Sequence, residues 1–499
     1  MLSDEVLLEI FDFCQENYYT DDVFEELTGV WDWRILVHVC QRWRQVVFAS
    51  PLRLNLQIRC TYGTPVRKNL DIWPTLPISI QYLDPDSWSN EGIYEDAITA
   101  LEHPDRVSAV GLWVVTGQQL QKIFTVMHEP FPALTHLALS DYGSNSPALP
   151  SEFLGGSAPC LQTINLHGIP FPALPTLLLS TSNLVTLYLS NIPQTGYIPP
   201  EALAPALATL TRLRYLKIGF QSPASRPAQI YLPPVTRTVL PALTDFNFFG
   251  VQEYLEDFIA RIDAPLLADT FIHLFNQLFD FEVPRLCQFI ERSELDRSTR
   301  CSLEFRKESV YFVAGRGFSP PTPVHHLDRC MYVEIRCEGI DWQVSHIYQA
   351  LNQLSAVLSN VAHVKINFDS SSPELEDIGD IEWPQLLRSL ASVQTLIVSG
   401  PFTGHLSRAL DDSDTPGGME TDVLPALEML CLEGQPVSSV HKFIAARSES
   451  GHPVTTIDHI MTQKLADVLV KAHVQFCLTA RESPCGPIER SGVSCAWAH

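Results

Sequence analysis

The sequence has none of the features that mark membrane, secreted or disulfide-bonded proteins. No run of about 18 uncharged apolar residues occurs, and the first thirty residues carry acids where a secretory signal has a basic segment and then an apolar one. The 12 cysteines include no Cys-x-x-Cys pair, and no Asn-x-Ser/Thr glycosylation acceptor with a permitted middle residue is present. We therefore expect reduced thiols, no membrane span, no secretory signal and a location in the cytoplasm, the nucleus or both.

Positive charge is scarce. The chain has 33 Lys and Arg against 57 Asp and Glu, which gives a formal net charge of −24. Because acidic groups repel phosphate, this balance disfavours nonspecific binding to nucleic acid or to an anionic membrane, and it favours basic partners. We expect neither nucleic acid nor a membrane among the partners.

Catalytic and cofactor-binding motifs are also missing. The sequence has no Gly-x-x-x-x-Gly-Lys-Ser/Thr loop and no Gly-x-Ser-x-Gly elbow. His325 and His326 are adjacent, and the odd separation of Cys330 and Cys337 puts them on opposite faces of a strand, so neither pair suits a metal ion. We therefore expect that the protein is not an enzyme, that it binds no cofactor, and that it has no catalytic or metal-binding residues.

What the sequence does contain is a repeated frame with apolar residues at its first, fourth and sixth positions. Clear copies occupy 134–139 and 184–189, and degenerate copies occur at 267–272, 300–305 and 330–335. Successive copies start 23 to 34 residues apart, which overlaps and slightly exceeds the leucine-rich-repeat period of about 20–29 residues. The twelve first positions are Val107, Leu134, Leu161, Leu184, Leu213, Leu243, Leu267, Arg300, Cys330, Val361, Val393 and Leu427.

Stretches with helical spacing lie between these frames, for example at 120–127, 286–290 and 347–358. A strand, a turn and a helix per repeat, stacked in parallel, bury each apolar face only against neighbouring repeats. The sequence therefore predicts an α/β fold, an irregular leucine-rich-repeat solenoid shaped as a horseshoe, with parallel strands on its concave side and helices on its convex side. Proline-led entries such as Pro132 and Pro241 replace the asparagine of regular repeats, which predicts uneven curvature.

Composition divides the chain into four parts. A small all-α domain is expected to precede the solenoid. Two acidic, turn-rich loops at 373–382 and 411–422 are expected to be solvated insertions. The predicted parts are a helical domain at 1–50 with an insertion at about 14–32, a transition with atypical entry strands at 51–100, the solenoid at 101–478 and a disordered tail at 479–499.

Two amphipathic helices are predicted in the helical domain. Residues 2–13 place Ser3 as an N-cap and acids in the first turn, where the helix dipole favours them. A second helix runs from about 33 to 48 with one apolar face, and it stops before Pro51. Because helices this short are unstable alone, both need packing partners.

These residues resemble the F-box family, whose members begin Leu-Pro-x-Glu-Leu-Leu-x-x-Ile and continue to Val-Cys-x-x-Trp. Here the two motifs read Leu-Ser-Asp-Glu-Val-Leu-Leu-Glu-Ile at 2–10 and Val-Cys-Gln-Arg-Trp at 39–43. Ser3 stands where the family usually has Pro, and about twenty residues from Cys14 to Asp32 are inserted between the halves. Nearly the entire chain looks like the F-box proteins with leucine-rich repeats that are expanded in mushroom-forming fungi, through motifs at 53–67, 73–74, 443–447 and 451–454.

The resemblance implies that the helical domain binds the Skp-type adaptor of a cullin–RING ubiquitin ligase, and through it a cullin. Apolar residues that remain uncovered after a small domain has packed are buried by the partner, as a helix is in a groove. Some of the matched residues must instead form the domain's own core. The positions carried over for adaptor binding are Leu2, Leu7, Ile10, Leu36, Val39 and Trp43.

The predicted solenoid offers a second binding surface on its concave face. Residues that flank the fourth and sixth frame positions point away from the core. Aromatic and basic side chains are typical of binding hot spots, although aromatics on strands also arise from sheet packing. The predicted ladder is His136, Tyr188, Tyr215, Lys217, Phe271, Glu304, Arg306, Tyr332, Glu334, Arg336, Lys365 and Asn367. Its candidates for binding a target are Tyr188, Tyr215, Lys217, Arg306, Tyr332, Arg336 and Lys365.

Together these features predict the substrate-recognition subunit of an SCF-type ubiquitin ligase, whose F-box binds the adaptor and whose repeats bind an unknown target protein. The alternative is a repeat scaffold or recognition protein outside any ligase, with a degenerate F-box. Ser3 and the insertion keep that alternative open. Binding to the adaptor distinguishes the two.

Overall fold

The computed structural model of the chain shows a mixed α/β protein built on one large sheet. The acidic loops at 373–382 and 411–422, the tail at 479–499 and residues 17–33 of the predicted insertion lie outside the described residues. The residues that the structure describes are 2–16, 34–51, 53–54, 56–61, 66–73, 76–82, 91–113, 116–141, 143, 146–222, 236–275, 282–293, 295, 299–315, 330–337, 340–368, 383–399, 423–433, 440–449 and 451–460.

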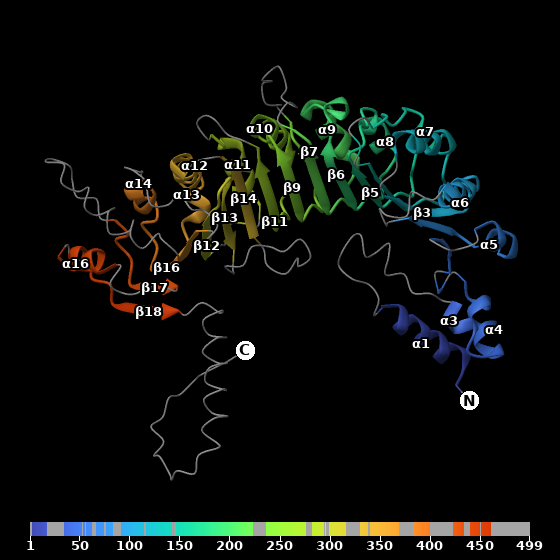
Figure 1. Cartoon of the computed structure of the whole chain (residues 1–499), viewed down its shortest axis with the longest axis horizontal. Coiled ribbons are helices and arrows are strands. Elements are labelled where there is room, and N and C mark those ends of the chain that lie inside the picture. Colours follow the sequence, from blue (N-terminus) through green and yellow to red (C-terminus); the bar gives the residue numbers. More distant parts are fainter. Residues whose placement is uncertain are drawn as a thin grey trace, which may run out of the picture.

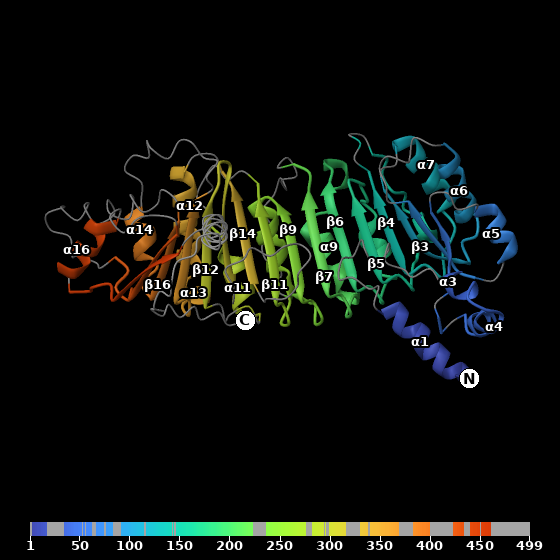
Figure 2. The same cartoon turned by 60° about the horizontal axis from the view of Figure 1, so that its bottom comes forward.

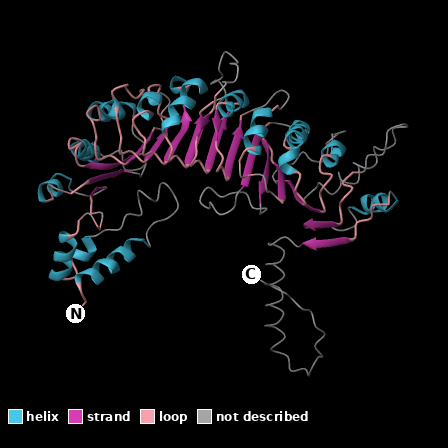
Figure 3. Cartoon of the chain, turned by 180° about the vertical axis from the view of Figure 1, so that it is seen from behind, coloured by secondary structure: helices cyan, strands magenta, loops and turns pink. Residues whose placement is uncertain are grey.

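The sheet has 16 strands and curves into an arc, with helices along its convex side (Figures 1 and 3). Most neighbouring strands are parallel. A separate parallel pair consists of β8 (Thr238–Val239) and β10 (Ile262–Asp263). In order along the arc the strands are β1 (Ile58–Cys60), β2 (Ile78–Tyr82), β3 (Val107–Leu112), β4 (His136–Ser140), β5 (Thr163–His167), β6 (Thr186–Ile192), β7 (Tyr215–Phe220), β9 (Asp245–Gly250), β11 (Asp269–Leu274), β14 (Cys330–Arg336), β13 (Ser309–Gly315), β12 (Arg300–Phe305), β15 (His363–Phe368), β16 (Thr395–Ser399), β17 (Met429–Glu433) and β18 (Thr456–Ile460).

The apolar frame explains where these strands form. Each of the twelve predicted frames contains one strand of the sheet. In β6 the frame residues Leu187 and Leu189 are buried, whereas Tyr188 between them is half-buried on the other face. Alternation along a strand therefore places the fourth and sixth frame positions in the core, as the sequence predicted.

Helices cover the convex side between many of the strands (Figure 3). In α7 (Gly117–Val126) the apolar side chains of Leu120, Ile123 and Phe124 are buried, and Thr116 forms a capping box with Gln119. The three predicted helical stretches coincide with α7, α11 and α12–α13. The remaining helices of this region are α5 (Val66–Ile72), α6 (Glu91–Leu101), α8 (Leu174–Leu178), α9 (Pro200–Ala206), α10 (Gln252–Ala260), α11 (Pro284–Glu291), α12 (Ile340–Gln353), α13 (Ser355–Leu358), α14 (Trp383–Arg388) and α16 (His441–Glu449), with 3-10 turns η2 (Phe153–Gly156), η3 (Gln194–Gly196) and η4 (Leu207–Thr209).

The predicted order of the repeats is wrong at the centre of the sheet. The frames at 300 and 330 were expected in chain order and parallel to their neighbours. Instead β14 pairs with β11, β12 pairs with β15, and β13 lies antiparallel between them. Only residues 306–308 separate β12 from β13, and so short a connection can join only antiparallel neighbours. The β12–β13 hairpin therefore stands where the sequence predicted one parallel repeat. Every residue of β13 is buried.

In the described residues, three short helices precede the sheet: α1 (Asp4–Glu16), α3 (Arg34–Val37) and α4 (Gln41–Ala49). They lie together below one end of the arc (Figures 1 and 2). Ser3 caps α1 as predicted, since its hydroxyl accepts the backbone N–H of Val6 at 3.4 Å. The single second helix predicted at 33–48 is wrong, because Cys40 has an extended backbone and its thiol caps α4 by accepting the N–H of Trp43 at 3.4 Å.

The segment between these helices and the first predicted repeat is continuous with both. Leu54 and Leu56 are buried, and β1 and β2 begin the sheet. The ring of Phe48, near the end of α4, lies 4.9 Å from that of Trp73, which follows α5. The N-terminal helices are therefore joined to the sheet by apolar packing as well as by the chain.

Candidate functional site

Large apolar side chains are exposed mainly on the three N-terminal helices. Within the described residues twelve large apolar side chains are exposed, and half of them belong to this short region, with exposed fractions between 39% and 66%. Exposed apolar groups gathered in one place mark an interaction site, whereas single ones are ordinary. The six residues, called the N-terminal apolar surface below, are Leu2, Val6, Ile10, Phe13, Ile35 and Val39.

The helix α1 is apolar on two sides. Leu7 and Phe11 are buried one turn apart, and the ring of Phe11 meets the half-buried Trp43 edge-on at 4.9 Å. Val46 and Val47 of α4 complete this small core. One side of α1 already packs against α4, whereas its second apolar side, which carries Ile10, stays exposed.

Ion pairs fasten α1 to the rest of the helical unit. Arg42 of α4 reaches Asp4 at 2.7 Å, and Arg53 reaches Asp12 at 2.9 Å and Glu9 at 2.5 Å. Such exposed pairs add little to stability because solvent screens them. Their geometry nevertheless fixes which side of α1 faces outward.

The predicted adaptor-binding residues divide into exposed and buried ones. Leu2, Ile10 and Val39 belong to the N-terminal apolar surface. Leu7 and Leu36 are buried in the unit's own core, so a partner cannot touch them directly. Trp43 is half-buried and packs on that core.

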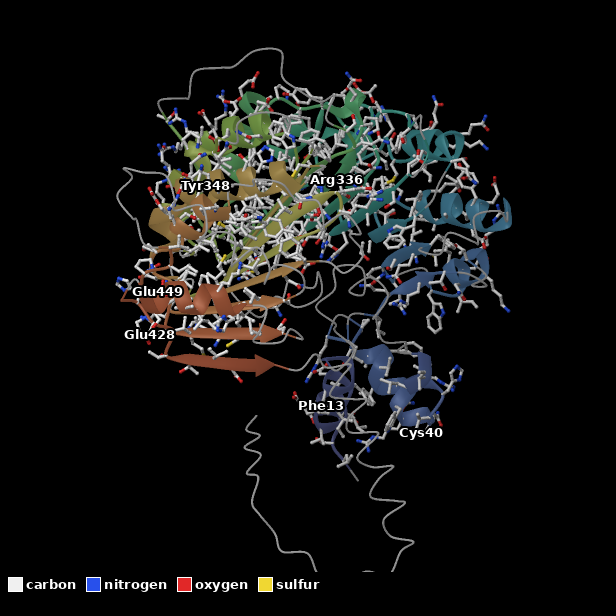
Figure 4. The ribbon with its side chains drawn as sticks, turned by 60° about the vertical axis from the view of Figure 1, so that its left-hand side comes forward. Phe13, Cys40, Arg336, Tyr348, Glu428 and Glu449 are labelled. Atoms are coloured by element: carbon white, nitrogen blue, oxygen red, sulfur yellow. The ribbon has the colours of Figure 1, made fainter. Side chains whose placement is uncertain are left out.

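Sequence reasoning left out Phe13 and Ile35, the two most exposed members of the surface (Figure 4 labels Phe13). Residues 2, 6, 10 and 13 recur at helical spacing beside the buried stripe. That second stripe was the signal that could have identified Phe13. Ile35 lies just after the predicted insertion and outside the stripe of α1.

On the concave face, strand register aligns side chains from distant repeats. Tyr188, Lys217 and Asn247 form one row across β6, β7 and β9. The same row continues to Phe271 and Tyr332 on β11 and β14. Through Val313 and Ser302 the row goes on to Lys365 on β15, so register brings four of the predicted target-binding residues onto one line: Tyr188, Lys217, Tyr332 and Lys365.

Aromatic rings stack across the centre of this face. The ring centre of Phe271 lies 5.3 Å from that of Phe249 and 4.1 Å from that of Tyr332, to which it is nearly parallel. The ring centre of Tyr332 lies 5.1 Å from that of Tyr311. The stack ends in cations, with Lys217 above Phe249 at 5.2 Å and Arg306 above Tyr311 at 4.6 Å. Such contacts stabilise by roughly 0.5–1.5 kcal/mol each beyond burial.

Carboxylates bind the polar ends of the central stack. His273 lies 3.1 Å from Glu334, which also accepts the Tyr332 hydroxyl at 3.0 Å. Burial alone would raise the pKa of the Glu334 carboxyl, but the hydrogen bond and charge of His273, helped by Tyr332, hold that pKa at about 2. Burial, and then the charge of Glu334, raises the pKa of Tyr332 well above its usual value. The hydroxyl therefore stays protonated and donates.

The predicted target-binding residues are not equally accessible. Tyr332 is 5% exposed and packs with Tyr311 and Val313 in a small second core, so its prediction as an accessible contact is wrong. Arg336 at the end of β14 is exposed. Arg306 pairs with Glu304 at 2.9 Å, Lys365 with Glu433 at 2.9 Å, and Tyr188, Tyr215 and Lys217 are half-buried.

A polar hollow of about 330 Å³ lies at the carboxyl ends of β4 to β7. The backbone is unusual here: Gly168 and Asn191 have φ of +69° and +54°, and a side chain at Gly168 would collide with the carbonyl oxygen of Asp141. A register shift also follows Leu189 in β6. The hollow carries no charged group, being lined by Gly143, Ser146, Gly168, Asn191, Pro193, Gln194, Thr195 and Gln221.

Within the part of the chain that the structure describes, no group of three or more His, Cys, Asp or Glu could hold a metal ion, and no helix has the length and hydropathy to cross a membrane. His325 and His326 lie outside that part. No protein-family model and no curated protein matches the chain. A family assignment therefore has to come from the chain's own residues.

Proposed function

We propose that the protein is an F-box protein with a leucine-rich-repeat solenoid, and that it acts as the substrate receptor of a cullin–RING ubiquitin ligase. The observation that carries the proposal is the N-terminal apolar surface, which lies on the helices whose sequence resembles the F-box. Burial of apolar side chains by a partner favours association, and these six are 39% to 66% exposed. An apolar helix surface of this kind suits a helix-in-groove contact with a Skp-type adaptor.

The rest of the chain supports the second half of the proposal. Each of the twelve frames contains a strand, and helices lie along the convex side of the arc, and both observations support a leucine-rich-repeat solenoid. Its concave face would hold the target protein. The ligase partners then supply the chemistry, while the receptor contributes the local concentration and orientation of the target lysine.

Ile10→Asp is expected to weaken binding to a purified fungal Skp-type adaptor at least tenfold. The change removes an apolar contact and would place a charge in the interface. Ile10 is 39% exposed and lies outside the small core, so the melting temperature should stay within about 2 °C of the parent protein. Co-purification and a titration of adaptor binding measure the effect.

Leu179→Asp is the matched control, since Leu179 is also an exposed apolar residue (59%, against 39% for Ile10) but directly follows α8, far along the chain from the N-terminal helices. It should leave adaptor binding unchanged. If the parent protein binds no adaptor, or if both variants bind as tightly as the parent, the ligase proposal fails. The repeat-scaffold alternative then takes its place.

A further inference from the structure

Three basic side chains on the far half of the concave face lie beside carboxylates. His273 on β11 lies 3.1 Å from Glu334, and Lys365 on β15 pairs with Glu433 at 2.9 Å. Arg306 likewise pairs with Glu304 at 2.9 Å. These three therefore offer little free charge to a partner, whereas Arg336 at the end of β14 is exposed.

Lys217 on β7 differs from these residues. No carboxylate among the described residues forms an ion pair with it, and its ammonium lies 5.2 Å above the ring of Phe249. Asp245 on β9 is the register partner of Tyr215, not of Lys217. Its carboxylate accepts a hydrogen bond from the hydroxyl of Thr244. Among the described residues, Lys217 is thus a cation without an acidic partner, in a chain whose net charge is −24.

The neighbours of Lys217 suit an anion. Its register partners on the two adjacent strands are Tyr188 and Asn247, one a hydroxyl and the other an amide. A hydroxyl and an amide on the strands beside one ammonium are groups that can donate hydrogen bonds to a small anion.

Partial burial makes this position responsive to a partner. Burial lowers the pKa of Lys217 because the ammonium has lost part of its hydration. An arriving anion restores a strong interaction in surroundings of reduced dielectric, where attraction between charges exceeds that in water. Lys365 already pairs with Glu433, so an arriving anion would add less attraction there than at Lys217.

We propose that Lys217, flanked by Tyr188 and Asn247, forms a site for a carboxylate group of a target protein. This proposal rests on the proposed function only for the identity of the partner, which is the target protein bound by the concave face. One ammonium balances one negative charge, which fits a carboxylate. The net charge of −24 disfavours a doubly charged phosphate.

The test uses the full chain with its lysines reductively methylated with ¹³C, so that each of its eight lysines gives its own NMR signal. Sodium acetate and sodium phosphate are titrated separately at ionic strength held constant with sodium chloride. Lys217→Met assigns the relevant signal by its loss. We expect a saturable shift of the Lys217 signal at millimolar acetate, and no saturable shift of the Lys365 signal.

Melting temperatures provide an independent measurement, because a ligand that binds only the folded state raises them. Acetate in place of chloride should raise the melting temperature of the parent and of Lys365→Met more than that of Lys217→Met. A Lys217 shift with phosphate alone would overturn the carboxylate assignment. Equal responses of Lys217 and Lys365 would overturn the site itself. Both results leave adaptor binding untouched, so this proposal and the ligase proposal can fail separately.

Discussion

Replacing Arg447 with alanine should destabilise the C-terminal end of the sheet by about 3 kcal/mol. Arg447 on α16 is buried, and its guanidinium donates to the carbonyl oxygens of Val423 at 2.6 Å, Leu424 at 2.8 Å and Leu427 at 3.3 Å. Leu424 has a φ of +56°, so this turn is strained and depends on those bonds. Alanine leaves buried acceptors unsatisfied, at about 1–3 kcal/mol each where water cannot replace the donor.

Hydrogen exchange resolved along the chain measures this effect where it arises. Protection should fall in β17 and α16 and stay unchanged in β4 to β7. Arg447→Lys should lose most of the same stability, because an ammonium cannot reproduce the planar fork that spans three carbonyls. Lys442→Ala, an exposed change on the same helix, is the control. Uniform loss of protection along the whole chain would contradict a local role for Arg447.

The strands were predictable because the information for them is local. Apolar residues at alternate positions, such as Leu187 and Leu189, report which face of a strand is buried wherever the strand lies in the sheet. The cap at Ser3 is local in the same way. What the frame cannot report is which strands become neighbours.

The wrong predictions arise because the apolar frame does not determine which strands pair. The frames at 300 and 330 look like successive repeats, yet the hairpin of β12 and β13 reverses their order, and β13 follows no frame at all. Tyr332 consequently faces Val313 and the ring of Tyr311 instead of solvent. In the helical unit, a thiol cap at Cys40 divides one amphipathic pattern into two helices. Pairing and capping of this kind depend on contacts that periodicity does not contain.

The acid sensitivity of the centre of the sheet is expected to depend on Glu334. Its pKa in the folded protein is about 2, against an ordinary value of 4.5. A carboxyl with a lowered folded-state pKa stabilises the protein fully above its unfolded-state value, and that stabilisation is lost as the pH falls towards the folded-state value. Each unit is worth about 1.4 kcal/mol, so about 3 kcal/mol should disappear between about pH 4.5 and pH 2.

Glu334→Gln keeps the shape of the side chain and removes its charge. The variant should be about 3 kcal/mol less stable than the parent at pH 7, and the difference should shrink as the pH falls below about 4.5. Urea unfolding at a series of pH values gives both curves, and Glu449→Gln, an exposed change on α16 (Figure 4), should follow the parent throughout. A gap between parent and Glu334→Gln that stays constant down to pH 2 would mean that the charge of the Glu334 carboxylate beside His273 does not stabilise the contact between β11 and β14.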